Sequence, residues 1–295
     1  MTATLLAHLS DPHLPYLAKP RLRELLGKRA LGHLNWSRNR HMFHKRDVLD
    51  ALVRDIHGKH PAHIALTGDL VNLALPAEFA PARAWLEGVG SATDVSVVPG
   101  NHDAYVRATK HRFTDMFGDY MRGDNAAAPA FPYMRQRGLL QLIGLSSSLP
   151  TAPFMATGKL GQAQLQALDK LLAAPMDEPR FRVLMIHHPL TSRSSYKRLI
   201  DSEALQAILR RHCVDLILHG HDHIHSTMWF DGPDRKIPAI GVPSASALPR
   251  GHHPGAAWNL FAITRMGNDW RCEQRVRSMG ADGHIHEIKQ VMLRG

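Results

Sequence analysis

Five short apolar runs along this chain each end in a cluster of side chains that can bind a metal ion. In chain order the clusters are Asp11/His13, Asp69, Asn101/His102/Asp103, His187/His188 and His221/Asp222/His223. In open α/β sheets, ligands gather at the carboxyl ends of strands. We therefore expect the five loops to converge on one edge of a sheet.

The chain alternates between strand-like and helix-like patterns over most of its length. Apolar runs are followed by amphipathic segments with helical spacing, at 46–57, 76–87, 162–173 and 202–211. The expected strands are 4–10, 63–67, 95–98, 139–145, 181–186 and 214–218. Further runs at 224–230, 237–242, 258–264 and 270–276 predict a β-rich tail. We expect this tail to complete a second sheet packed on the first, with helices outside both sheets and one core.

Composition limits the class of protein. The 295 residues are 44% hydrophobic and 21% charged, which is typical of a soluble globular protein. No apolar run approaches the ~20 residues that span a bilayer. The first ten residues resemble a strand rather than a secretory signal, and two distant cysteines favour a reducing cytoplasm. We expect one domain over 1–295 in the cytoplasm, and a peripheral position at the inner membrane stays open.

The charge and the histidine content both indicate chemistry on an anion. A formal charge of +10 favours anionic partners, and many of the 21 histidines stand beside Asp, Asn or Gly at the end of an apolar run. Mixed imidazole and oxygen ligands suit several transition metals. Two cations ~3.5–4 Å apart need a shared ligand, and Asp69, on a Gly-Asp turn, is the natural bridge. The sequence therefore predicts two divalent metal ions, with Mn, Fe or Zn expected.

As a set, the motifs resemble those of the calcineurin-like metallophosphoesterases. The resemblance covers residues 9–223 and includes the glycines beside the clusters and Pro189 after His188. It implies a four-layer α/β/β/α sandwich of two mixed sheets flanked by helices. It also implies the metal ligands: Asp11, His13 and His223 for the first ion, Asn101, His187 and His221 for the second, and Asp69 for both. His102 would face the scissile phosphate as a catalytic group, and Asp103 would orient it.

Departures from subfamily patterns indicate the branch. Purple acid phosphatases have a tyrosine where this chain has Asn72, and the lipid A pyrophosphatase usually has arginine in place of His102. The remaining resemblance is to bacterial cyclic-nucleotide and glycerophosphodiester phosphodiesterases. We expect a phosphodiesterase in which hydroxide held between two metals cuts the ester. A lipid-linked nucleotide pyrophosphatase of the UDP-diacylglucosamine type, a nuclease and a non-catalytic scaffold are the alternatives.

A basic insertion at about 17–46 is the most distinctive local feature. It has one acid, Glu24, among many interleaved basic and apolar residues. Its basic residues from 19 to 46 are Lys19, Arg21, Arg23, Lys28, Arg29, Arg38, Arg40, Lys45 and Arg46. Three interpretations stay open, which are a solvated helical insertion, a cap over an anionic substrate, and a contact with acidic lipid.

The remaining expectations concern single residues and partners. A second basic loop, with Arg193, Tyr196, Lys197 and Arg198, follows the His187 motif and is either a phosphate contact or a solvated loop. The partner that we expect is an anionic phosphodiester, with no stable nucleic-acid complex, and a homodimer stays open. Residues expected to support the structure are His8, His188, His219 and His225. Those left open as a pocket rim are Ser244, Ser246, His252, His253 and Asn259.

Overall fold

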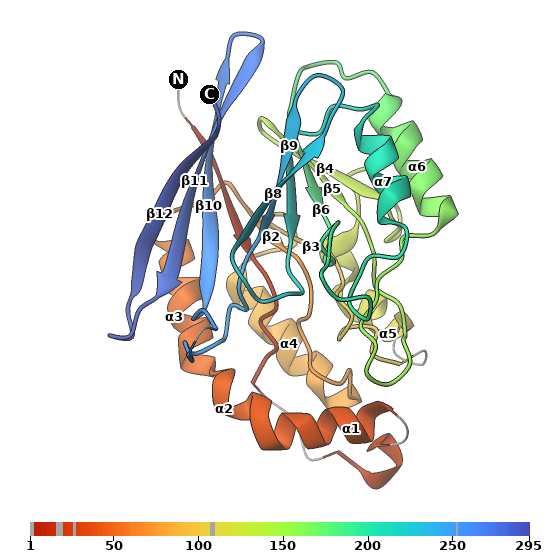
Figure 1. The fold of residues 1–295 in the computed structure, drawn as a ribbon, viewed down its shortest axis with the longest axis vertical. Coiled ribbons are helices and arrows are strands. Elements are labelled where there is room, and N and C mark those ends of the chain that lie inside the picture. Colours follow the sequence, from red (N-terminus) through yellow and green to blue (C-terminus); the bar gives the residue numbers. More distant parts are fainter. Residues whose placement is uncertain (1–2, 16–19, 26–27, 107–109, 252) are drawn as a thin grey trace.

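The computed structural model describes residues 3–15, 20–25, 28–106, 110–251 and 253–295. Lys19 and His252, which the sequence singled out, lie outside the described residues. Two six-stranded sheets face each other and run along the long axis of the molecule (Figure 1). Both sheets are mixed, as expected.

The first sheet combines strands from the two ends of the chain. Its order is β12 (Ile285–Arg294), β11 (Asp269–Met279), β10 (Ala257–Met266), β1 (Thr4–Leu9), β2 (His63–Leu66) and β3 (Val95–Val97). Strands β1, β2 and β3 are parallel, and β10 pairs antiparallel with β1, with Thr4 opposite Ile263. The three parallel strands therefore end at the same edge.

The second sheet is built around the middle of the chain. Its order is β4 (Tyr133–Arg137), β5 (Leu140–Gly144), β6 (Phe181–Met185), β7 (Leu216–His219), β9 (Lys236–Gly241) and β8 (Ser226–Asp231). The prediction that the β-rich tail completes this sheet was wrong in part. Only β8 and β9 join it, because β10 pairs along the edge of β1 and brings β11 and β12 into the first sheet. Strands β4 and β12 were not predicted.

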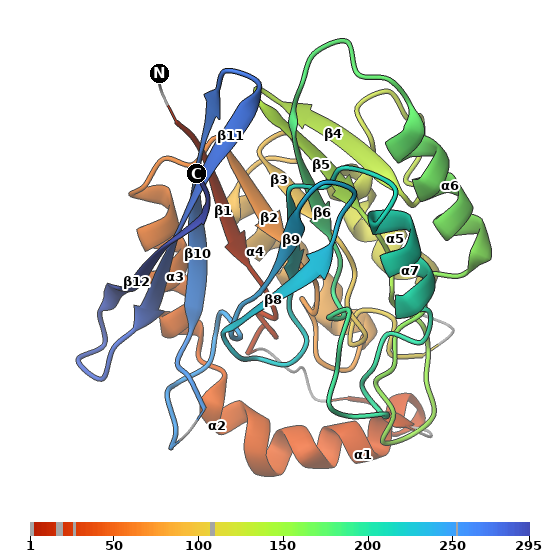
Figure 2. The ribbon, with the colours of Figure 1, turned by 45° about the horizontal axis from the view of Figure 1, so that its top comes forward.

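Helices cover the outer faces of the two sheets, which confirms the four-layer arrangement (Figure 2). The first sheet is covered by α3 (Arg46–His57) and α4 (Pro76–Val89), with α5 (Lys110–Phe117) beside α4. The second is covered by α6 (Gln162–Ala173) and α7 (Ser202–Leu209). Successive side chains of β6 point to opposite faces of the second sheet. Val183 and Met185 point into the core between the sheets, whereas Leu184 points to α6 and α7.

The insertion forms two helices at the carboxyl end of the sheets. Helix α1 (Lys28–Asn35) continues through a π-helical turn, Trp36–Arg40, into α2 (His41–Phe43), and both cross below β1 in Figure 1. Among the described helices, none has both the length and the apolar character that crossing a bilayer requires.

Candidate metal centre

The loops that follow β1, β2, β3, β6 and β7 bring the predicted residues together at one edge. Five of the seven predicted ligands have a left-handed backbone: Asp11 (φ 53°), His13 (36°), Asp69 (56°), His221 (74°) and His223 (55°). Such a conformation costs about 1–2 kcal/mol per non-glycine residue and is found mainly where function requires it. Several ligand positions thus share the same strained geometry.

Glycines allow these loops to approach one another. A Cβ on Gly100 would collide with the carboxylate of Asp69, and a Cβ on Gly220 would collide with Ser10 and Asp11. Gly68 has φ +96° and a Cβ there would meet the backbone of Gly100. The absence of a side chain at these three positions therefore permits sharp turns and close packing around the predicted ligands.

A first group of donor atoms comes from the loops after β1 and β7. His223 Nε2 lies 3.1 Å from His13 Nε2 and 3.2 Å from Asp11 Oδ1. His13 Nε2 is 3.8 Å from Asp11 Oδ1 and 3.7 Å from Asp69 Oδ2. Asp11 and His13 are fully buried, whereas the side chain of His223 is 32% exposed, so the group reaches solvent on the side of His223.

A second group lies on the other side of Asp69. Asn101 Oδ1 is 3.1 Å from His187 Nε2 and 2.9 Å from His221 Nδ1, and the two ring nitrogens are 3.3 Å apart. Asp69 Oδ2 lies 3.4 Å from His187 Nε2. The Nδ1 of His187 donates to Thr67 O at 2.6 Å, which leaves the lone pair on Nε2 directed into the group. One carboxylate oxygen of Asp69 therefore faces both groups.

The donor sets fit two cations. Two ligands bound at about 2.1 Å to one ion are separated by roughly 3–3.5 Å. Most spacings in the second group have this size, as do the two distances from His223 in the first, whereas the distances from His13 to the carboxylates are longer. Without a cation, the lone pairs of these carboxylate, amide and imidazole ligand atoms would point at one another, and the repulsion between them would be unfavourable. Asp11, His13, Asp69 and His223 would hold one ion, and Asp69, Asn101, His187 and His221 the other.

The same crowding perturbs the acid–base properties of the ligands in the absence of a cation. Burial opposes a charged His187, but the carboxylates of Asp69 and Asp11 raise its pKa to about 10. Burial alone would raise the pKa of Asp11, but the charge and hydrogen bond of His223 hold it well below its usual range. The site therefore concentrates negative charge that only protons or cations can compensate.

His102 lies beside the first group. Its ring is centred 4.8 Å from that of His13, and its backbone N–H donates to Asp69 Oδ1 at 2.7 Å. Its Nδ1 lies 2.5 Å from Asn72 O, and its ring stacks on Tyr105 at 5.4 Å. Asn72 O is thus a partner that fixes the orientation of the ring.

Asp103 differs from the role that the resemblance implied. Its fully buried carboxylate accepts hydrogen bonds from four backbone amides at 2.8–3.2 Å, those of Asp69, Leu70, Val71 and Gly100. The expected orientation of His102 by Asp103 is therefore corrected. Both carboxylate oxygens are taken up by backbone amides, so Asp103 ties the β2 and β3 loops together. Burial, helped by the charge of Asp69, raises the pKa of Asp103 to about 8.

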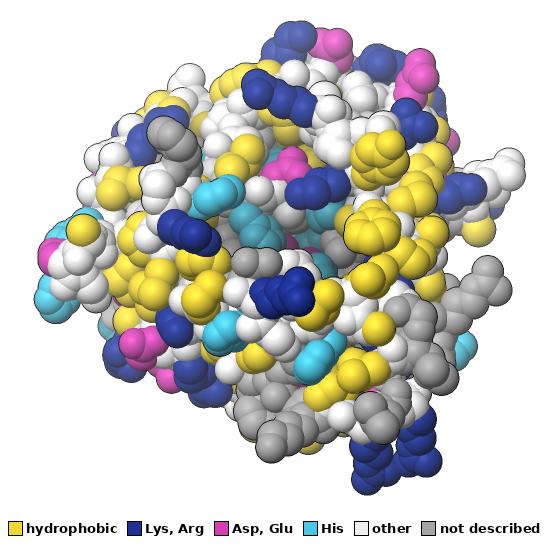
Figure 3. Space-filling model, turned by 60° about the horizontal axis from the view of Figure 1, so that its bottom comes forward, with side chains coloured by type: hydrophobic (Ala, Val, Ile, Leu, Met, Phe, Trp, Pro, Cys, Tyr) yellow, Lys and Arg dark blue, Asp and Glu magenta, His cyan; other side chains and the backbone are white. Residues whose placement is uncertain are grey.

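A pocket of about 320 Å³ opens above the metal ligands. It is lined by Asp69, Asn101, His102, Ala156, Lys197, His221, Asp222, His223 and His253. On this face a hollow shows histidine and acidic side chains, with lysine and arginine at its edge (Figure 3). Lys197 therefore belongs to the pocket, where its charge can reach a phosphate.

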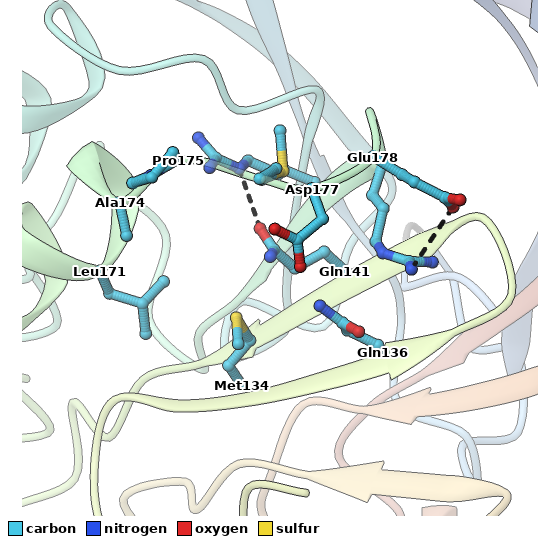
Figure 4. Close-up of a pocket in the computed structure, with 11 residues that line it drawn as sticks. Met134, Gln136, Gln141, Leu171, Ala174, Pro175, Asp177 and Glu178 are labelled. Carbon is cyan, nitrogen blue, oxygen red and sulfur yellow. Dashed lines mark hydrogen bonds and ion pairs between the residues drawn. The ribbon is translucent and has the colours of Figure 1, made fainter. Parts of the chain in front are cut away.

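A second pocket provides a contrast at the far side of the second sheet (Figure 4). It contains the buried Arg182, whose guanidinium donates to Gln141 Oε1 at 2.9 Å and to Leu172 O at 3.1 Å. Arg180 is paired with Glu178. The two arginines of this pocket are therefore matched with acceptors, unlike the ligand groups.

The insertion packs directly on the site loops. Arg29 donates to Leu73 O at 3.1 Å and Ala74 O at 2.5 Å, and a Cβ on Gly32 would collide with Tyr105 and Leu73. Lys28 Nζ lies 4.7 Å from the Tyr105 ring centre. Helix α1 thus packs against the residues that support His102, an arrangement that a substrate cap and a lipid contact share.

Sequence reasoning missed His44, which the insertion places beside the first group. The buried His44 ring lies 5.1 Å from that of His13, and its Nδ1 is 2.8 Å from Ser246 Oγ. Ser244 Oγ donates to Asp11 O at 2.6 Å. No motif marks His44 in the sequence, because its position depends on the pairing of the insertion with the 244–248 loop.

Comparison with known proteins places these features in a family. A family model described as calcineurin-like phosphoesterase matches residues 4–225. A protein of Rhodococcus erythropolis named probable cyclic nucleotide phosphodiesterase is 30% identical over 63% of this chain, and one of Synechococcus with the same kind of name is 27% identical over 59%. The alignments span only 59% and 62% of these relatives.

Solved structures show the same fold at low sequence identity. The purple acid phosphatase PPD1 of yellow lupin aligns with a TM-score of 0.62 and 12% identity, over 97% of this chain and 53% of that one. The sulfate thiohydrolase SoxB of Thermus thermophilus aligns with a TM-score of 0.50 and 16% identity, over 99% and 57%. At such identities the likeness establishes the architecture alone.

Proposed function

The chain belongs to the calcineurin-like phosphoesterase family, and from this we propose that it is a binuclear metal-dependent phosphodiesterase. One observation carries the proposal. Seven side chains from five loops lie in two groups of possible ligand atoms, and Asp69 Oδ2 faces both groups. When bound, two divalent cations would lower the pKa of water and neutralise phosphate oxygens. The mixed nitrogen and oxygen donors suit Mn, Fe or Zn.

The residues around the ligands divide the remaining work. We assign His102 as the group that donates a proton to the leaving oxygen, because Asn72 O and Tyr105 fix its ring at the edge of the pocket. Lys197 would hold a phosphate oxygen from the opposite side of the pocket. Asp103 keeps the β2 and β3 loops in register, so Asp69 and Asn101 stay aligned.

The substrate class follows from the relatives and the pocket. The two relatives named above carry the name of cyclic nucleotide phosphodiesterases, which makes 3′,5′-cyclic nucleotides the first diesters to test. The pocket is open and cationic at its edge, which suits a diester of moderate size.

The test is a panel assay after metal reconstitution. The full chain, loaded with Mn²⁺, would be assayed with bis(4-nitrophenyl) phosphate, 4-nitrophenyl phosphate, cyclic nucleotides and glycerophosphodiesters. We expect diesters to be cut faster than the monoester, and Asn101→Ala to lose most of this activity. Asn268→Ala, on the exposed hairpin between β10 and β11, is the matched control and should match the wild type. Equal activity in Asn101→Ala, or no hydrolysis by the metal-loaded wild type, would contradict the proposal.

A further inference from the structure

Four segments surround the mouth of the metal pocket and contact one another. We call residues 28–44, 151–156, 193–200 and 247–251 the rim. Lys28 Nζ donates to Thr151 Oγ1 at 2.6 Å and to Met155 O at 3.0 Å. Backbone hydrogen bonds then join Ala156 N to Tyr196 O and Leu248 N to Phe43 O, both at 2.8 Å. The rim is therefore one continuous surface around the site.

Large apolar side chains on the rim are exposed rather than packed. Helix α1 buries none of its described residues, although it carries two leucines. Residues with an exposed apolar side chain are Leu31, Leu34, Met42, Phe154, Met155, Tyr196, Ile200 and Leu248. Ala156 and Lys197, which line the metal pocket, are sequence neighbours of the exposed Met155 and Tyr196. The apolar surface therefore begins where the pocket ends.

Phe154 is the most exposed of these side chains. Its relative exposure is 85%, and its backbone is left-handed with φ 64°. A bulky residue rarely adopts this conformation, and an exposed aromatic ring gains nothing from burial to offset the cost. The geometry holds an aromatic ring out from the rim beside the mouth of the pocket.

The charge of the rim has one sign. Its sequence contains eight basic residues and no aspartate or glutamate. The basic residues are Lys28, Arg29, Arg38, Arg40, Arg193, Lys197, Arg198 and Arg250. In Figure 3, lysine and arginine side chains alternate with hydrophobic ones around the hollow of the site. The rim is therefore both positively charged and rich in exposed apolar side chains.

These two properties select one kind of partner. Uniform positive charge favours a polyanionic surface over a protein patch with charges of both signs. Aliphatic side chains such as Leu34 and Ile200 cannot stack on bases, so they add nothing to binding a nucleic acid. Aliphatic and aromatic groups mixed with lysine and arginine are instead what binds at the interface of an anionic bilayer.

We propose that the rim docks on an anionic lipid bilayer, with Phe154 and Tyr196 at the level of the headgroups and the metal pocket facing the membrane. The docking itself does not depend on the proposed function. Its consequence does, because the access of lipid phosphodiesters to the pocket matters only if the protein is a phosphodiesterase. No helix has to enter the bilayer for this arrangement.

Sedimentation of the full chain with lipid vesicles tests the docking. Vesicles of phosphatidylcholine alone are compared with vesicles of equal parts phosphatidylcholine and phosphatidylglycerol. We expect binding to the anionic vesicles, weakened by salt. Phe154→Ser should reduce the affinity about tenfold, and Arg198→Ser about fivefold. Ile288→Ser removes an apolar side chain that is 56% exposed on β12, outside the rim, and should bind like the wild type.

The outcomes separate the docking from the proposed function. Hydrolysis of a soluble diester by Phe154→Ser should equal that of the wild type, because this side chain lies outside the pocket. Full hydrolysis without vesicle binding, or equal binding by the Phe154 and Ile288 variants, overturns the docking. Co-sedimentation with single-stranded DNA but not with anionic vesicles also overturns it, and assigns the rim to nucleic acid. Absence of metal-dependent hydrolysis by the wild type instead contradicts the proposed function.

Discussion

Buried histidines in this molecule form two groups, one inside the strands and one at the strand ends, and the groups differ in the atoms that their rings face. Inside the strands, His8 lies 3.0 Å from Thr67 Oγ1, and His63 lies 2.8 Å from Ser96 Oγ. At the strand ends, His187 and His221 face an amide oxygen and each other. Burial is nearly complete in both groups, so burial does not distinguish a ligand from a structural histidine.

The difference lies in the partners. A hydroxyl can both donate and accept, so it can pair with either form of a ring nitrogen of a neutral imidazole inside a sheet. In His63 this holds for Nε2, whereas Nδ1 is buried without a hydrogen-bond partner. The loops instead supply carboxylate and amide oxygens. These atoms only accept hydrogen bonds, so the group has more acceptors than donors. His188 shows the boundary between the groups. It follows His187 directly, yet its Nδ1 pairs with Ser147 Oγ at 2.7 Å and its Nε2 with Ala156 O at 3.1 Å. A cation site is recognised by the convergence of acceptors.

Replacing one histidine from each group should give the largest contrast. His187→Ala should lose about one equivalent of metal and a thousandfold or more of activity, since each cation stabilises the transition state by several kcal/mol. His63→Ala should keep both the metal and the activity and lose about 1–3 kcal/mol of stability, because Ser96 loses its shorter hydrogen bond and keeps only a longer one from Arg135. Metal analysis and a diester assay measure both effects. Equal metal loss in the two variants would break the comparison.

His102 sharpens the comparison because it is a loop histidine without an assigned metal. His102→Ala should lower kcat about a hundredfold or more through loss of the proton donor, with the metal content unchanged. His225→Ala removes an exposed histidine just beyond His223 and is the matched control. Loss of metal in His102→Ala would instead place this residue among the ligands.

The strand histidines should make stability depend on pH. Burial, with the charges of Arg137 and Arg135, lowers the pKa of His63 to about 3. Because the folded pKa lies below the unfolded value of about 6.5, this stabilisation is present above pH 6.5 and is lost as the pH falls toward 3. At pH 5 the loss is about 2 kcal/mol for His63.

Denaturant unfolding of wild type and His63→Gln at pH 7.5 and pH 5 measures this difference. The variant should lose about 2 kcal/mol less than the wild type on acidification. An identical pH dependence in the two proteins would show that His63 is not held neutral by the fold.

Lys197 should show the smallest effect. Its exposed side chain lines the pocket without a ligand role. Lys197→Ala should raise KM about fivefold for an anionic diester, or ~1 kcal/mol, and leave kcat nearly unchanged. Steady-state kinetics at low and high salt check this, because salt should reduce the difference. A large fall in kcat would instead assign Lys197 to the chemical step.

Much of the fold was predictable because most apolar runs become strands within a few residues of the expected bounds. The apolar run of β6 and the helical spacing of α3 are local signals that survive in the structure. The pairing of β10 with β1 is a contact between the two ends of the chain, so local patterns could not reveal it. Strand β12, which is mostly exposed, lacked the apolar run that marks a strand.

For the site, too, local motifs were predictable from the sequence and long-range contacts were not. The ligand loops were predictable because each carries its own motif after a strand. The groups that support them were not, because Glu78, which accepts hydrogen bonds from the Asn72, Leu73 and Leu75 amides, lies in a helix with an ordinary sequence. The role of Asp103 also depends on where its carboxylate meets the amides after Asp69, which only the folded chain shows.

The most direct measurement of the central claim is the metal content of the full chain. After chelation and dialysis against Mn²⁺, the wild type should retain two equivalents per chain, and Asp69→Ala one or fewer. A wild type that retains less than one equivalent, or an Asp69→Ala variant that keeps both, would contradict a pair of cations joined by Asp69.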